Sequence, residues 1–150
     1  MTDTNTARIT VANQKGGAGK TTDVIHTGGA LAARGQDVLL VDIDYHGGLT
    51  CSLGYNDLYY DTDRTTLFDV LDFDQMESVN DIIVEHEEFD ILPASEKLAN
   101  NKNIQTLLEA PKSRERLEMT LDELEKDYDY IIVDTPPSLN VLTDNALVAT

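Results

Sequence analysis

The chain has 150 residues, of which 28 are acidic and 11 basic, so its formal net charge is −17. This length has room for one α/β domain with a substantial core, and we expect a single domain over residues 1–150. The one cysteine, Cys51, excludes a framework of internal disulfide bonds. Residues 1–8 lack the apolar core of a signal peptide, and no apolar run approaches the roughly 20 residues of a membrane span. We therefore expect a soluble, cytoplasmic protein with no membrane segment.

Segments typical of strands and helices alternate along the chain. Residues 9–12 and residues 38–42, which are apolar up to Asp42, read as buried strands, and residues 22–34 between them as a helix that ends at Gly35. The later elements that the pattern predicts are a short helix over 67–71, strands over 82–84 and 89–92, helices that begin at Ser95 and Ser113, a strand over 131–133 and a helix over 143–149. This alternation predicts a doubly wound parallel sheet with helices on both faces.

A glycine-rich run joins the first expected strand to the first expected helix. Residues 13–22 read Asn-Gln-Lys-Gly-Gly-Ala-Gly-Lys-Thr-Thr and contain the pattern G-x-x-G-K-T of a phosphate-binding loop. Glycines let the backbone turn tightly and direct its N–H groups at phosphate oxygens, while the helix N-terminus favours an anion. Lys20 is placed to reach the terminal phosphates, and the Thr21 hydroxyl is placed to ligate Mg²⁺. The residues expected to bind nucleotide are Gly16, Gly17, Ala18, Gly19, Lys20, Thr21 and Thr22.

Three ordered motifs together narrow the class of protein. Lys15 stands ahead of the glycines and extends the loop to K-G-G-x-G-K-T-T. Residues 38–44 with 47–50 and 53–54 give a second motif, and residues 130–139 with 142–143 and 145–147 give a third. In these motifs the chain resembles the ParA/MinD (Soj-like) family of deviant Walker A partition ATPases, over residues 9 to 147.

The resemblance implies a fold, cofactors and partners. The fold would be a mostly parallel, doubly wound sheet of the P-loop NTPase type with helices on both faces. The cofactors would be ATP and Mg²⁺, and the activity ATP hydrolysis by a nucleotide-gated homodimer. A ParB-like partner protein and DNA would follow from a role in plasmid or chromosome partitioning. Lys20 would serve the nucleotide of its own subunit, whereas Lys15 would reach the nucleotide of the partner subunit.

Three carboxylates have expected roles at the carboxyl ends of strands. Asp134 follows an apolar strand and would lie beside Mg²⁺, which keeps several waters and suits such a carboxylate. Asp44 lies past the second strand, where its family counterpart is thought to orient the attacking water. Asp42 shares that strand end and either contacts the waters of Mg²⁺ or hydrogen-bonds the backbone. The expected catalytic residues are thus Lys15, Lys20 and Asp44, and the expected metal residues Thr21, Asp134 and Asp42.

Several positions depart from the family pattern. Tyr45-His46 replaces the usual Pro-Gln, Gly48 a usual Asn and Asp23 a common Thr. Gly28 and Gly29 either allow close helix–sheet packing or mark a loosely constrained helix. Two other functions therefore stay open: a nucleotide-binding assembly module with little hydrolysis, and a MinD-like positioning ATPase.

Family members typically continue well beyond the third motif. The expectation is therefore that the C-terminal part of the family fold is missing. The chain would then be a fragment, a split gene product or a protein that dimerises to cover exposed surface.

The charge of −17 is typical of a protein from a salt-rich cytoplasm, so we expect a haloarchaeal member of the family, truncated as described above. This expectation gives a first prediction. Like charges at this density repel one another in the folded state, and salt shortens the Debye length from about 10 Å at ~0.1 M to about 3 Å at ~1 M. The melting temperature should rise as KCl increases from ~0.1 M to ~2 M. Scanning calorimetry measures it, and a flat or falling melting temperature would contradict the prediction.

Overall fold

The computed structural model describes residues 5–12, 19–72 and 77–150. Within these residues five strands form one sheet in the order β1-β5-β2-β4-β3. The strands are β1 (Ala7–Val11), β2 (Val38–Asp42), β3 (Val84–Glu85), β4 (Asp90–Leu92) and β5 (Tyr130–Asp134). Every pair is parallel except β3 with β4, which is antiparallel. The expected mostly parallel sheet is confirmed.

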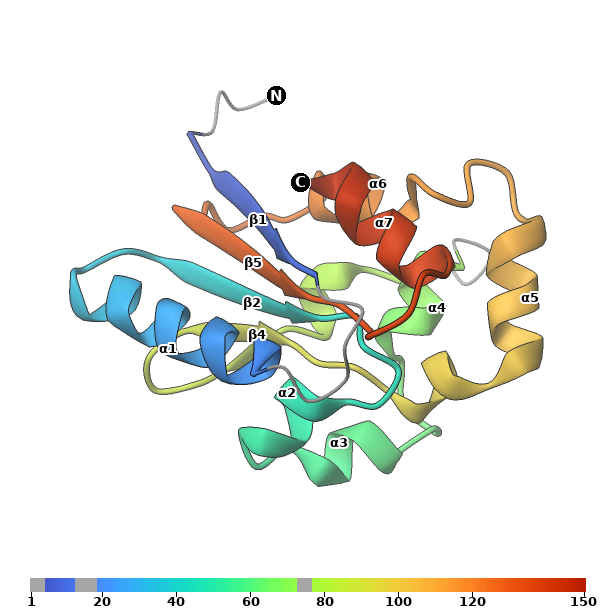
Figure 1. Ribbon diagram of the computed structural model, residues 1–150, viewed down its shortest axis with the longest axis horizontal. Helices are drawn as coiled ribbons and strands as arrows, with labels where there is room; N and C mark the ends of the chain where they lie inside the picture. The colour runs from blue at the N-terminus through green and yellow to red at the C-terminus, as the bar shows by residue number, and fades with distance from the viewer. Residues whose placement is uncertain (1–4, 13–18, 73–76) are drawn as a thin grey trace.

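Helices pack on both faces of this sheet (Figure 1). The helices are α1 (Lys20–Ala33), α2 (Gly48–Ser52), α3 (Asn56–Tyr60), α4 (Leu67–Leu71), α5 (Asn101–Glu109), α6 (Arg116–Leu121) and α7 (Val141–Ala149), with 3₁₀ turns η1 (Val79–Asp81) and η2 (Glu96–Ala99). In Figure 1, α1 lies on one side of the sheet, and α6 and α7 lie on the other.

The central strand β2 divides the core into two layers. Its side chains alternate, so Leu39 and Val41 pack with α4, α6 and α7, whereas Val38 and Leu40 pack with α1. All four side chains are buried, as an apolar strand inside a parallel sheet requires. The doubly wound arrangement expected from the sequence is therefore confirmed.

Close packing explains a glycine inside α1. A Cβ atom on Gly28 would lie 2.8 Å from Cδ2 of Leu40 on β2. Any larger residue would require the buried Leu40 side chain or the helix to shift, so the first of the two alternatives for Gly28, close helix–sheet packing, describes the structure.

Parallel register brings the functional strand ends together. Asp42 at the end of β2 pairs with Asp134 at the end of β5, which in turn pairs with Val11 at the end of β1. The backbone N–H of Ile43 donates to the carbonyl of Asp134 at 3.0 Å and carries this pairing one residue further. The carboxyl edge of the sheet thus holds Asp42 and Asp134 side by side.

Some elements differ from the expectation. Residues 82–83 are not in a strand, because they leave the 3₁₀ turn η1 and only Val84 begins β3. The helix expected from Ser95 is split, since Asn100 caps α5 by accepting from the N–H groups of Lys102 and Asn103. Helices α2 and α3 were not expected, because five residues are too short to show an apolar repeat.

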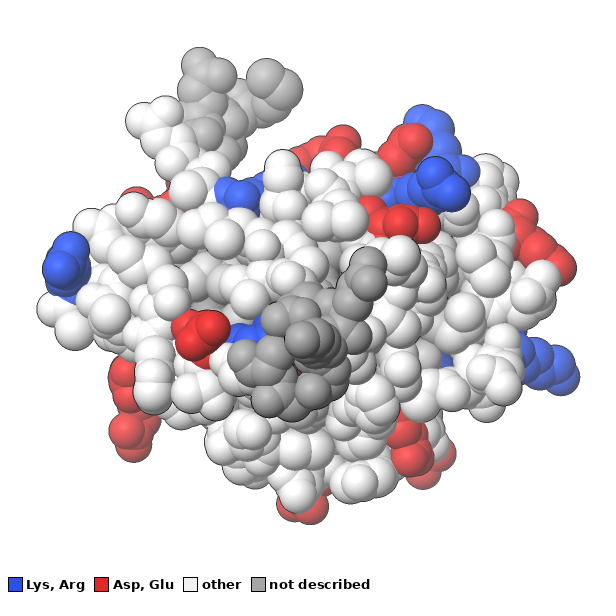
Figure 2. All heavy atoms as spheres, viewed as in Figure 1, with Lys and Arg blue, Asp and Glu red and all other residues white. Residues whose placement is uncertain are grey.

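Charged side chains on the face in Figure 2 lie in small separate groups, with basic and acidic ones interspersed. No extended basic patch is visible on this face. No helix in the described ranges is long and apolar enough to cross a membrane.

A second prediction concerns Gly47, which precedes α2. Its φ is +67°, and a Cβ atom there would overlap the ring of Tyr59. Gly35 is a matched control, because its φ is +83° but a Cβ atom would meet no atom within 4 Å. Gly35→Ala should lower the free energy of unfolding by about 1–2 kcal/mol through the backbone alone. Gly47→Ala should cost a further amount of about 1–3 kcal/mol from overpacking. Urea unfolding of both variants measures the difference, and equal losses would contradict the role of Tyr59.

Candidate functional site

The candidate site lies where α1 begins and where β2 and β5 end. Lys20 and Thr21 form the first turn of α1, and Asp134 ends β5. Gly19 precedes the helix with φ of +78°, a left-handed conformation that glycine adopts without strain. The structure therefore brings together residues more than a hundred positions apart, as the sequence predicts for a carboxyl edge.

Asp134 is the centre of the contacts. The Thr21 hydroxyl Oγ1 donates to Asp134 Oδ2 at 2.8 Å. Lys20 Nζ lies 3.3 Å from Asp134 Oδ1 and 3.8 Å from Asp44 Oδ2. The lysine ammonium is thus held between two carboxylates.

Burial raises the free-energy cost of the charge on Asp134. Asp134 is fully buried, and burial raises its pKa, although the hydrogen bond from Thr21 and the charge of Lys20 act in the opposite direction. Within the described part of the chain, its Oδ1 accepts no hydrogen bond. That oxygen lies 3.3 Å from the Lys20 ammonium, and a buried carboxylate beside a threonine hydroxyl fits a hydrated divalent cation, because Mg²⁺ binds one or two protein oxygens and keeps several waters. Thr21 and Asp134 therefore have the chemistry of a Mg²⁺ site.

Asp42 has different contacts. Its Oδ2 accepts from the backbone N–H of Thr50 at 2.9 Å and from the Thr50 hydroxyl at 2.7 Å, and its Oδ1 accepts from the N–H of Asp44 at 3.1 Å. Burial raises the pKa of Asp42 to about 7, while the two bonds from Thr50 oppose that rise. Of the two roles considered for Asp42, hydrogen bonding to the backbone is the one that these contacts match. They anchor the loop after β2.

Asp44 lies in that loop and is also buried, at 5% exposure. Its Oδ1 accepts from the backbone N–H of His46 at 2.9 Å, and His46 Nδ1 lies 3.2 Å from the same oxygen. Its Oδ2 is the oxygen that faces Lys20. The two oxygens of Asp44 therefore face different neighbours.

Of the other residues singled out in and next to the phosphate-binding loop, those at the start of α1 lie in the described ranges. Thr22 and Asp23 are exposed on the first turn of α1. Lys15, Gly16, Gly17 and Ala18 lie outside the described residues, and their expected roles stay predictions.

Sequence reasoning missed two contributors to the site. Thr50 binds Asp42, and its hydroxyl also accepts from the N–H of Ala94 after β4 at 2.9 Å. His46 was noted as a departure from the family pattern, but its contact with Asp44 was not anticipated. A hydroxyl eight residues after a strand-end aspartate carries no local signal, because a loop of irregular shape brings the two together.

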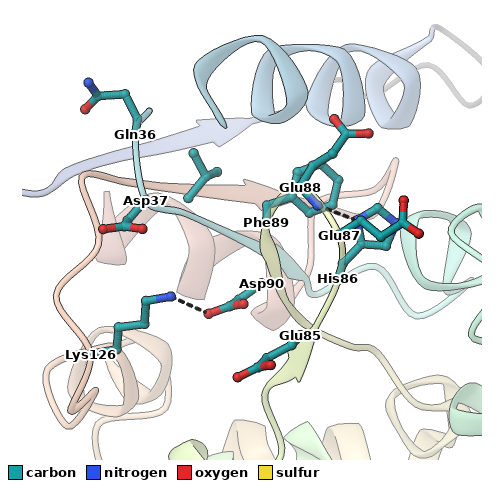
Figure 3. A pocket seen from close by; sticks show the side chains of 10 residues that line it. Gln36, Asp37, Glu85, His86, Glu87, Glu88, Phe89, Asp90 and Lys126 are labelled. Carbon is teal, nitrogen blue, oxygen red and sulfur yellow. Dashed lines mark hydrogen bonds and ion pairs between the residues drawn. The ribbon is translucent and has the colours of Figure 1, made fainter. Parts of the chain in front are cut away.

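A polar cavity of about 340 Å³ lies at the opposite edge of the sheet (Figure 3). It includes Asp37 and Val38 at the start of β2 and Asp90 at the start of β4. Lys126 Nζ pairs there with Asp90 Oδ2 at 3.1 Å, and further acidic side chains come from the turn between β3 and β4. The cavity is therefore separate from the site that contains Lys20.

Known proteins resemble this chain over nearly its whole length. A family model described as an AAA domain, AAA_31, matches residues 6–150. The sporulation initiation inhibitor protein Soj of Bacillus subtilis is 42% identical over 144 residues, which cover 94% of this chain and 54% of Soj. The chromosome partitioning protein ParA of Caulobacter vibrioides is 38% identical over 143 residues, which cover 94% of this chain and 52% of ParA.

Solved structures agree with these relatives. A Mycobacterium smegmatis protein described as a cobyrinic acid a,c-diamide synthase, with bound ADP and magnesium, matches with a TM-score of 0.86 and 40% identity over 97% of this chain and 57% of its own. A plasmid partition protein of Borrelia burgdorferi bound to AMPPNP matches with a TM-score of 0.78 and 27% identity over 97% of this chain and 60% of its own.

The chain spans about half the length of the curated relatives it matches. Within that span the family model matches residues 6–150, and the fold agrees with that of the solved relatives. The chain belongs to the ParA/MinD family of P-loop ATPases.

Proposed function

We propose that this chain binds ATP with Mg²⁺ and hydrolyses it, as the nucleotide-binding part of a ParA-like partition ATPase. The observation that carries the proposal is the contact of Lys20 and Thr21 with the buried Asp134. The magnesium and ADP of the Mycobacterium smegmatis protein and the AMPPNP of the Borrelia burgdorferi protein support it, since both share this fold.

Lys20 has the central role in binding. Its ammonium lies between Asp44 and Asp134, with only 11% of its side chain exposed. Nucleotide phosphates offer more negative charge than either carboxylate, so Lys20 would transfer its contacts to them. Thr21 and Asp134 would hold the cation, which when bound supplies neutralisation of the charge on the transferring phosphoryl group.

Asp44 would orient the attacking water. Its Oδ1 is engaged by His46, which leaves Oδ2 for a further contact once Lys20 moves to phosphate. Phosphoryl transfer needs mainly positioning and charge neutralisation, so one acceptor oxygen for the water can suffice.

Assembly and partners follow from the family relationship. The proposal includes an ATP-dependent homodimer in which Lys15 contacts the nucleotide of the partner subunit, a ParB-like partner protein, DNA as the cargo and a cytoplasmic location. Phosphate contacts with DNA need clustered Lys and Arg. The chain has 11 basic residues, and those on the face in Figure 2 are scattered, so DNA binding by residues 1–150 alone should be weak.

A second candidate function is nucleotide-controlled assembly with little turnover. It is favoured by the contact of Asp44 Oδ2 with Lys20, because an oxygen that stays paired with an ammonium would orient water poorly. Phosphate release compared with a nucleotide-binding titration separates the two functions, since tight binding without release indicates the second.

A third prediction concerns nucleotide binding. Lys20→Ala should abolish measurable binding of Mg²⁺-ATP in calorimetry, because no other described cation lies within 4 Å of both Asp44 and Asp134. Thr21→Val should weaken binding with Mg²⁺ more than binding without it, since it removes only the hydroxyl. Lys102→Ala, on the exposed side of α5, is the control and should bind as the parent does. Unchanged affinity in a folded Lys20→Ala would contradict the proposed function.

A fourth prediction separates assembly from water activation. Lys15→Ala should bind ATP but lose nucleotide-induced dimerisation and hydrolysis, because an ammonium supplied by the partner would neutralise charge in phosphoryl transfer. Asp44→Ala should bind ATP and dimerise but hydrolyse slowly. Light scattering with and without ATP, together with phosphate release, distinguishes the two variants. A Lys15→Ala chain that dimerises and turns over like the parent would rule out the partner-directed role.

A further inference from the structure

His46 contacts Asp44 through both its backbone and its side chain. The backbone N–H donates to Asp44 Oδ1 at 2.9 Å, and the ring nitrogen Nδ1 lies 3.2 Å from the same oxygen. The backbone contact would survive any substitution other than proline, whereas the ring contact is particular to this side chain. Asp44 Oδ1 is thereby bound twice, while Oδ2 faces Lys20 at 3.8 Å.

The His46 ring packs against the ring of Tyr45, whose backbone is in turn bound by Tyr59. The Tyr45 and His46 rings lie 4.2 Å apart between centroids and are inclined by 39°. The hydroxyl of Tyr59 donates to the backbone carbonyl of Tyr45, and Tyr59 belongs to the hydrophobic core. Contacts therefore run from the core through Tyr59 and Tyr45 to His46 and on to Asp44.

We propose that His46 is a positioning residue, whose Nδ1–H holds Asp44 Oδ1 so that Oδ2 faces the phosphate end of the site. The inference rests on the proposed function, because it assigns Asp44 to the attacking water. A carboxylate fixed at one oxygen presents the other in a single direction, which lowers the entropic cost of orienting a water. His46 itself touches neither nucleotide nor water in this role.

The proposal requires one tautomer of the ring. A neutral imidazole carries one proton, and the nitrogen that has it is set by the hydrogen bond that it makes. Asp44 Oδ1 is a carboxylate oxygen and can only accept when ionised, so Nδ1 must carry the proton. Nε2 is then left as an acceptor on a side chain that is 59% exposed.

Kinetics test the consequence for turnover. His46→Ala should lower kcat about tenfold, the equivalent of one hydrogen bond of ordinary strength, with the affinity for a non-hydrolysable ATP analogue changed less than about twofold. His46→Gln keeps a side-chain N–H donor and should recover most of the loss. His26→Ala, at an exposed position of α1, is the matched control and should turn over as the parent does. A kcat of His46→Ala equal to that of the parent overturns the proposal, as does failure of His46→Gln to recover any activity.

Nuclear magnetic resonance tests the contact without any hydrolysis. At about pH 8, where an ordinary imidazole is neutral, the ¹⁵N shifts of the nucleotide-free chain should show the Nδ1–H tautomer for His46 but not for His26. Asp44→Ala should return His46 to the ordinary tautomer mixture. An Nε2–H tautomer at His46 in the parent overturns the proposal. A parent that shows this Nδ1–H tautomer but releases no phosphate overturns the proposed hydrolysis and leaves the contact with Asp44 supported.

Discussion

Three carboxylates converge at the ends of two adjacent strands, and their mutual repulsion is the constraint that the surrounding structure satisfies. Asp42 and Asp134 are partners in the parallel register, and Asp44 is only two residues further along. Burial and the charges of Asp134 and Asp44 both raise the pKa of Asp42. Buried charges of one sign are stable together only when each is hydrogen-bonded or paired.

Each of the three carboxylates is hydrogen-bonded or paired by a different set of neighbours. Thr50 supplies Asp42 with two hydrogen bonds, and Thr21 with Lys20 supplies Asp134. Asp44 is shared between Lys20 and His46. The start of α1 and the loop after β2 are therefore fixed by the same charges that the proposed chemistry uses. Before nucleotide binds, Lys20 balances the carboxylates; in the proposed bound state, phosphate and cation would take over that balance.

The sequence predicted those parts of the structure that depend on strong local patterns. The uninterrupted apolar run of residues 38–41 is typical of a buried strand, and an aspartate directly after such a run is expected at the carboxyl edge of a parallel sheet. For that reason the positions of Asp42, Asp44 and Asp134 were predictable. The five-residue helices α2 and α3 were not, because they are held by tertiary contacts such as that of Tyr59 with Tyr45 rather than by an apolar repeat.

The partners of the carboxylates were harder to predict than their positions. Nothing in the residue order shows that Thr50 folds back onto Asp42, or that the ring of His46 turns towards Asp44. Such contacts depend on loop geometry, and the left-handed Gly47 that closes this loop is next to a tyrosine ring twelve residues away in the sequence. The roles of Lys15 and of the glycines before Gly19 remain predictions from the motif.

The direction of the hydrogen bonds at Thr50 makes one hydroxyl group indispensable. The N–H of Ala94 can only donate, so the Thr50 oxygen accepts from it and must give its own proton to Asp42. Replacing Thr50 by valine would leave a donor after β4 without an acceptor and would remove one donor from Asp42 at the end of β2. Both groups are buried, and an unsatisfied buried group costs about 1–3 kcal/mol. One oxygen atom of α2 therefore joins the end of β2 to the residues that follow β4.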